Sequence, residues 1–398
     1  MDADKRRWLV IIAGMFSNLC QGSAYASSVF AKPIMAHFGC SREQSVLAFS
    51  LIIACLPLGA ITGGKFADQK GPRAVVMVGS LIFALGVFLA GFSWNMVTLY
   101  LTYGLMMGIG SGIAYGAIVG AVVKWFPDKR GLSSGLVVGA LGGGPLVLAP
   151  LAQALLDSPG LGLMGTFKVM GLAFLVVMLA AAYFISSPPK DYSPAGFNRS
   201  KPGARPMAAD ITWREMLKKS KFWFMFLLYA FGTFSGLMLI SQASPIAQEL
   251  AQAAPAMAAT IVGILALANA LGRVLWGAIS DKLGRLEALG SMFLITTLVM
   301  ISLPWVAGHI ISLTLAFILV GLCFGGYLGI FPSYCADSFG SKNISVNYGI
   351  LFSAFSLAGV FGPRIGAMFT YQTAFLAAAG VSLLGGILAL SAKFRQTS

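Results

Sequence analysis

One segment of the sequence reads Met257-Ala-Ala-Thr-Ile-Val-Gly-Ile-Leu-Ala-Leu-Ala-Asn269-Ala-Leu-Gly-Arg273-Val-Leu-Trp-Gly-Ala-Ile-Ser-Asp281-Lys282. Before Asp281 it holds a single ionisable residue, Arg273. A helix rises about 1.5 Å per residue, so Arg273 lies roughly 12 Å inside the end of the segment. This depth falls within a hydrocarbon layer about 30 Å thick. A charge there is costly unless it faces a polar cavity, so the segment predicts a membrane helix beside a substrate or ion pathway.

The composition of the whole chain is that of a membrane protein. Of its 398 residues, 58% are hydrophobic and only 10% are charged, and the mean hydropathy is +0.84. Soluble domains are about 25% charged, so a soluble enzyme is excluded. The net charge of +14 does not predict nucleic-acid binding, because an excess of Lys and Arg in cytoplasmic loops explains it.

Twelve apolar runs are long enough to span a bilayer. They cover roughly residues 8–30, 44–66, 74–92, 97–122, 132–154, 165–186, 222–243, 256–279, 287–306, 311–334, 346–369 and 371–392. One long polar interruption, residues 187–221, separates the first six runs from the last six. We expect an all-α membrane protein with twelve transmembrane helices in two six-helix bundles, residues 1–186 and 222–398, joined by a cytoplasmic linker loop.

Lys and Arg predict the orientation of the helices. Of the 27 basic residues, only four are expected on the side opposite the termini: Lys32, Arg42, Lys168 and Arg364. Basic residues concentrate in cytoplasmic loops. We therefore expect a multi-pass protein of the plasma (inner) membrane with both termini and the linker in the cytoplasm.

Two loops share the pattern G-x3-D-x2-G, at residues 64–71 and, 213 residues later, at 277–284. The repeat predicts that the two halves are pseudo-symmetric, an architecture found in transporters whose substrate sites lie between the halves. Acidic and basic residues at such helix ends are expected to form a gate, although solvated loop charges are the alternative. The predicted gating residues are Asp68, Arg73, Asp281 and Arg285.

The duplicated loops, the run Gly142-Gly-Gly-Pro145 and the pair Gly362-Pro363 resemble the major facilitator superfamily over the whole chain. A narrower similarity rests on residues 22–30, residues 125–131 and the Asn269-x3-Arg273 pair. These resemble the monocarboxylate transporter and oxalate/formate antiporter branch, which includes bacterial L-lactate transporters. The resemblance implies the major facilitator fold, a substrate carboxylate on Arg273, and aromatic residues of the fourth and tenth helices lining the site.

Two departures from these relatives narrow the expectation. Dicarboxylate-exchanging relatives have a lysine in the eleventh helix, whereas residues 351–361 here contain no basic residue, which favours a monocarboxylate over oxalate. Animal monocarboxylate carriers have an aspartate one turn before the arginine and a lysine in the first helix. This chain has Asn269 and Tyr25 at those places, so the proton relay of those carriers does not transfer to it.

Arg273 and Asn269 form the centre of the predicted substrate site. Asn269 lies one helical turn before Arg273, so the two side chains share a face. The guanidinium can present two parallel donors to a carboxylate, and Asn269 can orient it or bond the substrate. The alternatives are a structural arginine that bonds helix carbonyls or snorkels to the membrane surface, and an asparagine that packs helices.

The remaining residues of the predicted substrate site are Tyr115, Tyr327, Tyr25 and Ser356. Tyr115 and Tyr327 hold nearly equivalent positions in Gly-rich helices of the two halves, and an aromatic lining with a few polar groups is typical of small-molecule sites. Ordinary helix packing is the alternative for each tyrosine. For Ser356 the alternative is a hydrogen bond to its own helix backbone.

Catalytic and metal-binding groups are missing from the predicted spans. All thirteen Asp and Glu residues fall in predicted loops or at helix ends, and the five cysteines show no CxxC spacing. The sequence therefore predicts no metal site, no cofactor and no enzyme activity.

The sequence predicts a secondary active transporter of small monocarboxylates such as lactate or pyruvate. It is expected to be a proton-coupled, monomeric protein of the lipid bilayer that works by alternating access around Arg273. The alternatives are an anion exchanger of the oxalate/formate type and a carboxylate sensor that transports nothing.

Overall fold

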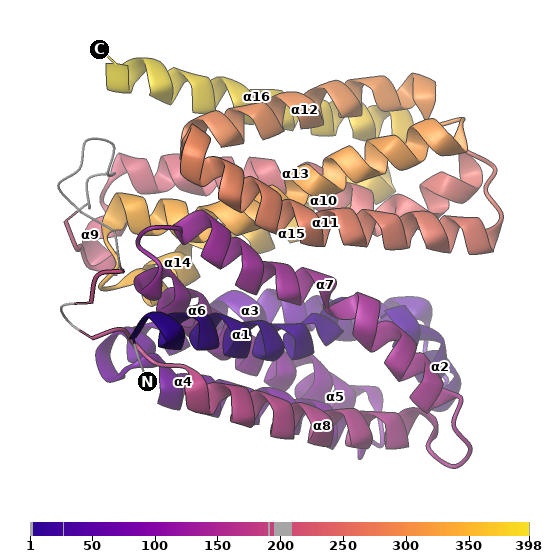
Figure 1. The fold of residues 1–398 in the computed structure, drawn as a ribbon. Helices are drawn as coiled ribbons and strands as arrows, with labels where there is room; N and C mark the ends of the chain where they lie inside the picture. Colours follow the sequence, from indigo (N-terminus) through magenta and orange to yellow (C-terminus); the bar gives the residue numbers. More distant parts are fainter. Residues whose placement is uncertain (1–2, 27, 190–191, 195–208, 398) are drawn as a thin grey trace. The chain divides into compact units, whose positions relative to one another are not determined.

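The computed structural model describes residues 3–26, 28–189, 192–194 and 209–397, and its regular elements there are all helices (Figure 1). The elements are α1 (Ala3–Gln21), η1 (Gly22–Ala26), α2 (Ser28–Phe38), α3 (Arg42–Lys70), α4 (Pro72–Ala90), α5 (Met96–Leu99), η2 (Tyr100–Met106), α6 (Met107–Trp125), α7 (Arg130–Leu156), α8 (Gly162–Phe184), α9 (Trp213–Leu217), α10 (Ser220–Glu249), α11 (Pro255–Leu283), α12 (Arg285–Val306), α13 (Ile310–Phe339), α14 (Ile344–Leu351), α15 (Ser353–Met368) and α16 (Tyr371–Thr397).

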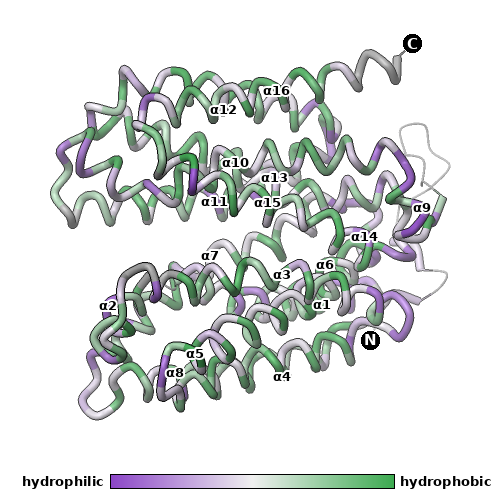
Figure 2. Tube along the Cα trace, turned by 180° about the vertical axis from the view of Figure 1, so that it is seen from behind, coloured by the Kyte–Doolittle hydropathy of each residue, from purple (hydrophilic) through white to green (hydrophobic). Residues whose placement is uncertain are grey.

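Twelve helical segments in the described part of the chain are long and apolar enough to cross a membrane. They overlap the twelve runs predicted from the sequence, and the predicted fold class is confirmed. The apolar surface agrees with this assignment. Figure 2 shows hydrophobic residues along the helices, and one face of α11 exposes Leu267, Leu271 and Leu275 at helical spacing. Such a face suits contact with lipid.

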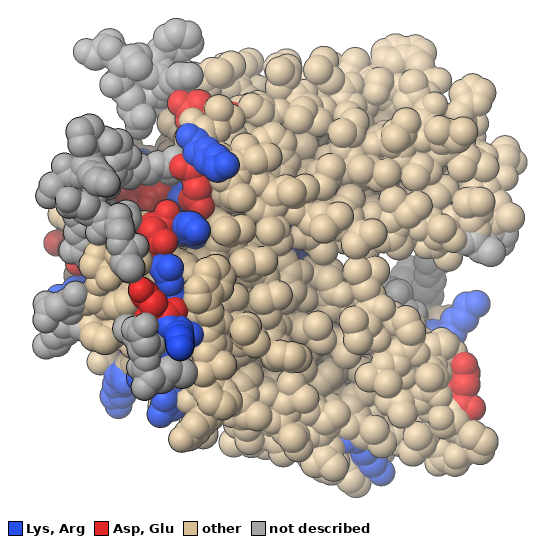
Figure 3. Space-filling model, viewed as in Figure 1, with Lys and Arg blue, Asp and Glu red and all other residues tan. Residues whose placement is uncertain are grey.

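Charged side chains lie mainly at the ends of the helices. In the view of Figure 3, Lys, Arg, Asp and Glu residues gather near the helix ends. The broad lateral faces show few of them. This distribution is expected where the lateral faces meet hydrocarbon, because a charge there costs free energy.

The first predicted span, residues 8–30, is not a single α-helix in the structure. Helix α1 ends at Gln21, and the 3₁₀ turn η1 carries the chain to Ala26. Gly22 lies against α7 so closely that a Cβ atom there would be 2.5 Å from the carbonyl oxygen of Leu141. The first span therefore changes from α-helical to 3₁₀ geometry at Gly22, and Asp4–Ala26 is still one candidate membrane span.

The chain divides into two compact units. Unit 1 contains residues 1–128, 140–216 and 335–350, and unit 2 contains residues 129–139, 217–334 and 351–398. Each unit thus takes in a short segment from the other half of the sequence. The division into 1–186, 187–221 and 222–398 stays a prediction about the repeat, and residues 190–191 and 195–208 of the linker lie outside the described residues.

Unit 1 is built around α6, which packs against α3 and α4. Glycines permit the close approach: a Cβ atom on Gly112 would lie 2.0 Å from the Leu56 carbonyl oxygen. Polar side chains join α6 to α1, because Ser111 Oγ donates to Gln21 Oε1 (2.9 Å) and Gln21 Nε2 donates to Asn18 Oδ1 (3.0 Å). Buried hydrogen bonds of this kind hold membrane helices together.

The described end of the linker is also fastened to unit 1, at the loop between α13 and α14. Asp210 Oδ1 accepts a hydrogen bond from the Lys342 N–H (2.9 Å), and the Ile211 N–H donates to the Phe339 carbonyl (3.2 Å). Asn343 Nδ2 donates to the Ile211 carbonyl (2.9 Å). These bonds place the start of α14, which carries part of the site described below.

In unit 2, α12 packs along α16 and α10 packs along α15. Helix α11 lies against α13 and against the first part of α7, and small residues make both contacts close. A Cβ atom on Gly325 of α13 would lie 2.0 Å from the Asn269 carbonyl oxygen. This packing fixes the backbone of α11 at the turn that carries Asn269 and Arg273.

Candidate functional site

Arg273 is buried inside unit 2, with 2% of its surface exposed. Its Nε donates to Asn269 Oδ1 (3.2 Å), and its Nη1 donates to the carbonyl oxygen of Val138 on α7 (2.8 Å). Among the described residues, Asn269 Oδ1 and the Val138 carbonyl oxygen are the two acceptors of hydrogen bonds from Arg273. Both acceptors are neutral. The side chain therefore carries a buried positive charge with no carboxylate partner in the described part of the chain, and the hydrogen bonds described here use its Nε and Nη1 groups.

The backbone of Arg273 is held between two glycine faces. A Cβ atom on Gly135 of α7 or on Gly329 of α13 would lie 2.3 Å from the Arg273 carbonyl oxygen. Both contacts bring backbone against backbone, so no side chain larger than the hydrogen of glycine fits at Gly135 or Gly329. The position of the guanidinium is thus determined by backbone packing and by Asn269, which bonds the Nε group. Such support preorganises a side chain for ligand binding.

The other residues predicted to bind substrate are distributed over both units. Tyr25 is half-buried in η1, and Tyr115 is buried in α6 of unit 1, where its hydroxyl shares a 3.2 Å hydrogen bond with the Tyr348 hydroxyl. Ser356 is half-buried in α15 of unit 2. Their participation in substrate binding stays a prediction.

Tyr327 lies in the packed interior of unit 2. Its ring centroid is 5.1 Å from that of Phe293, and a Cβ atom on Gly232 would lie 2.5 Å from its ring. Its hydroxyl lies near that of Thr296, and neither forms a well-aligned hydrogen bond with a described residue. These contacts pack the Tyr327 ring within unit 2, and its participation in substrate binding stays a prediction.

We expect the Tyr327→Phe variant to keep its thermal stability, or to gain up to about 1 kcal/mol, because the hydroxyl removed is buried without a good partner. The matched variant Tyr115→Phe loses a formed hydrogen bond and is expected to lose about 1 kcal/mol. Thermal unfolding of both purified variants measures this difference. A loss of stability in Tyr327→Phe larger than in Tyr115→Phe would contradict the packing described here, and lactate calorimetry on the same samples tests the predicted substrate role.

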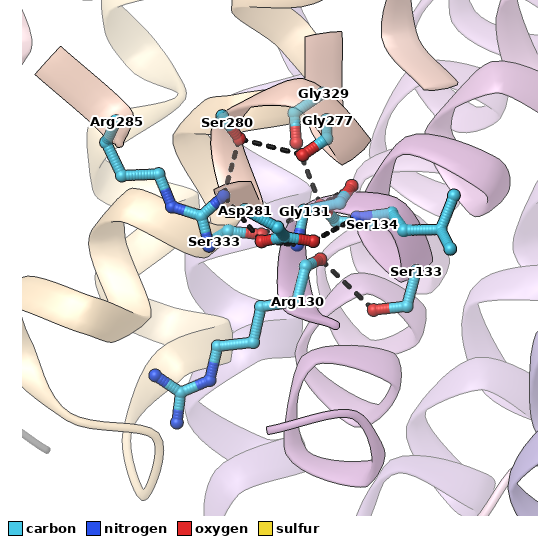
Figure 4. Close-up of polar contacts among 11 residues, drawn as sticks. Arg130, Gly131, Ser133, Ser134, Gly277, Ser280, Asp281, Arg285, Gly329 and Ser333 are labelled. Atoms are coloured by element: carbon cyan, nitrogen blue, oxygen red, sulfur yellow. Dashed lines mark hydrogen bonds and ion pairs between the residues drawn. The ribbon is translucent and has the colours of Figure 1, made fainter. Parts of the chain in front are cut away.

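Asp281 joins the end of α11 to the start of α7 (Figure 4). Its carboxylate accepts from the N–H groups of Gly131 and Leu132, both at 2.9 Å, and pairs with Arg285 Nη1 at 2.8 Å. Arg285 Nη1 also donates to Ser280 Oγ. We call Asp281, Arg285, Gly131 and Leu132 the Asp281 cluster. A carboxylate is well placed there because the first N–H groups of a helix lack intrahelical acceptors and carry partial positive charge.

Asp68 makes the corresponding arrangement in unit 1. Its side chain is 3% exposed, its Oδ1 pairs with Lys124 Nζ at 2.7 Å, and its Oδ2 accepts from the Val346 N–H of α14 at 3.0 Å. We call Asp68, Lys124 and Val346 the Asp68 cluster. In both clusters, the aspartate of one sequence half bonds the first turn of a helix from the other half, as a gate would require.

Arg73, the fourth predicted gating residue, lies elsewhere. It is exposed, its Nε donates to the Ile185 carbonyl (3.3 Å), and its guanidinium stacks on the ring of Tyr183. The cation that Asp68 pairs with is Lys124, which the sequence did not single out. The Lys124 position directly precedes the Trp125-Phe-Pro run, but only folding brings it to Asp68. Backbone partners such as Val138, Gly131 and Val346 leave no signal in a sequence.

Comparisons with known proteins give one family and several relatives. The profile described as Major Facilitator Superfamily matches residues 11–363 and 250–397. The chain is 31% identical over 394 residues to the oxalate:formate antiporter of Oxalobacter formigenes, covering 96% of this chain and 90% of that protein. It is 26% identical over 455 aligned positions to apicoplast pyruvate carrier 1 of Toxoplasma gondii, covering 88% and 82%. A crystal structure of FucP in the outward conformation matches with a TM-score of 0.72 at 16% identity, covering 96% of this chain and 97% of that chain, a likeness of fold alone.

Proposed function

The chain belongs to the major facilitator superfamily, and from this premise we propose that it is a secondary active transporter of small monocarboxylates such as lactate or pyruvate. It is a multi-pass membrane transporter and not an enzyme. The finer proposal is that the substrate carboxylate binds Arg273. We also propose that the protein is a monomer of the inner membrane. The distribution of Lys and Arg supports cytoplasmic termini.

The observation that carries the proposal is the uncompensated charge of Arg273. The guanidinium is buried, and its described acceptors, Asn269 Oδ1 and the Val138 carbonyl, are both neutral. A buried charge without a counter-ion is unfavourable, and a bound anion would relieve that cost. A carboxylate matches the planar guanidinium with two charge-assisted hydrogen bonds.

One cation in this span, Arg273, matches a substrate with one carboxylate group. Residues 351–361 of the eleventh span contain no Lys or Arg, and Arg273 is the single basic residue between Met257 and Ser280. A second carboxylate on the substrate would need its own partner in the membrane, because unpaired buried charges are costly. This supports a monoanion in place of a dianion such as oxalate.

Transport itself is proposed to proceed by alternating access. The Asp281 and Asp68 clusters would close one side of the protein and release in the opposite state, with Asp68, Asp281 and Arg285 as gating residues and Arg73 as a predicted fourth. All thirteen acidic residues lie outside the apolar cores of the twelve spans. We therefore propose that a coupled proton travels with the substrate or along hydroxyl groups and water.

Uptake of labelled L-lactate into proteoliposomes tests the function. We expect uptake above that of protein-free liposomes, and faster uptake when an inward proton gradient is imposed. The absence of lactate uptake in both conditions would refute the proposed substrate. Lactate binding without flux would instead support a carboxylate sensor.

Anion exchange is a second candidate, favoured by the relative whose printed name is oxalate:formate antiporter. Preloading the proteoliposomes separates the two mechanisms. An absolute requirement for an internal formate or oxalate counter-substrate favours exchange. Uptake into empty vesicles that follows the proton gradient favours symport.

A further inference from the structure

We propose that Arg273 couples anion binding to release of the first part of α7 from α11. The inference rests on the proposed function, because it needs an anion on Arg273. Its starting point is that Arg273 already bonds α7: Nη1 donates to the Val138 carbonyl at 2.8 Å. The guanidinium is therefore both the proposed substrate ligand and a tie between two helices inside unit 2.

A carboxylate competes with the carbonyl for this donor. Hydrogen bonds between ionised partners are roughly twice as strong as neutral ones, and a carboxylate binds a guanidinium best through two parallel N–H groups. With Nε occupied by Asn269, the edge formed by Nη1 and Nη2 is the fork open to an anion. An anion on that edge weakens or replaces the bond from Nη1 to Val138.

The contact between the two helices is otherwise built from glycine. Cβ atoms would lie 2.1 Å from the Gly277 carbonyl oxygen if placed on Gly131, and 2.3 Å from the Arg273 carbonyl oxygen if placed on Gly135. One turn further, a Cβ atom on Gly139 would lie 3.1 Å from Val274 Cγ2. Without side chains interlocked between them at these positions, the helices can separate without repacking a core.

Polar hydrogen bonds thus hold α7 against α11 at two positions along this glycine-lined contact. Arg273 bonds α7 near one end of the segment in unit 2, and Asp281 bonds the N–H groups of Gly131 and Leu132 at the other. An anion that takes over the donor at Arg273 leaves the Asp281 cluster to hold the contact. Substrate occupancy is thereby transmitted along α11 from the binding residue to the gate.

Linkage gives a direct test, because two coupled equilibria affect each other reciprocally. If the anion favours release, a mutation that weakens the contact must raise anion affinity. Gly135→Ala pushes α7 away from the Arg273 backbone, because its added Cβ atom would lie 2.3 Å from a carbonyl oxygen. Gly139→Ala makes milder contacts, with Val274 Cγ2 at 3.1 Å and the Ala270 carbonyl oxygen at 3.4 Å. Gly263→Ala is the matched control in α11, where an added Cβ atom meets nothing within 4 Å.

Calorimetry with L-lactate on the purified full-length variants measures the affinity. We expect a gain of about 5-fold or more for Gly135→Ala, a smaller gain for Gly139→Ala and no change for Gly263→Ala. Equal or weaker binding by both α7 variants, with folding confirmed by gel filtration and thermal unfolding, would overturn the proposal.

A second measurement follows the accessibility of α7 directly. Ser134 of α7 is buried, and its Oγ donates to the Gly329 carbonyl of α13 (2.8 Å). In a Ser134→Cys variant we expect lactate to accelerate maleimide labelling at position 134, followed by peptide mass spectrometry to separate it from the five natural cysteines. Lactate that binds by calorimetry but leaves labelling unchanged or slower overturns the coupling alone. An absence of lactate binding to the wild type refutes the proposed function instead.

Discussion

Replacing Arg273 by alanine is expected to abolish lactate uptake and to lower lactate affinity by about 100-fold or more. Each hydrogen bond to a charged group contributes about 1.5–3 kcal/mol, and a bidentate carboxylate loses two of them. The change also removes the single basic residue between Met257 and Ser280, so no nearby cation in the span can substitute. Calorimetry and proteoliposome uptake measure the two effects separately.

Arg273→Lys separates charge from geometry. Lysine keeps the positive charge but presents no planar fork, so we expect affinity between those of the wild type and the alanine variant, about 10-fold or more below the wild type. Wild-type affinity in Arg273→Lys would contradict a bidentate contact. Arg364→Ala, a change at an exposed arginine of α15, is the matched control and is expected to keep full uptake.

Asp281→Asn is expected to have the second largest effect, through the gate and not through the binding site. The change removes the ion pair with Arg285, which is itself buried, and an amide can accept from the Gly131 and Leu132 N–H groups with only one of its two terminal atoms. Breaking one side of a buried pair costs about 3–5 kcal/mol. Because the Asp281 side chain is 18% exposed, we expect about 2–3 kcal/mol here.

The consequence of Asp281→Asn is a looser contact between α7 and α11. Labelling of Ser134→Cys should become faster without lactate, and uptake should fall because the gate no longer closes fully. Unchanged labelling and uptake in a folded variant would show that the Asp281 cluster is no gate. Asp157→Asn, at an exposed aspartate beyond the end of α7, is the control and is expected to change stability by less than about 0.5 kcal/mol.

The sequence by itself determined the number of spans, their approximate positions and the repeat between the halves. These features follow from local properties, because crossing hydrocarbon requires a continuous apolar run of a given length. It also singled out Arg273 and Asn269, because a charge inside such a run stands out and a neighbour one turn away must share its face. The structure confirms that the two side chains bond each other.

Only the tertiary structure decided what these residues bond across the fold. The acceptor of Arg273 Nη1 is a backbone carbonyl 135 residues away, and the partners of Asp281 are backbone N–H groups about 150 residues away. Backbone groups are the same in every residue, so their positions are set by helix packing and leave no mark in the sequence. The same holds for the packing of Tyr327, whose ring lies against Phe293 and close to Gly232 of α10, while its predicted contact with the substrate stays a prediction. Local composition identifies a buried charge. The tertiary packing of the helices decides which groups form hydrogen bonds or ion pairs with it.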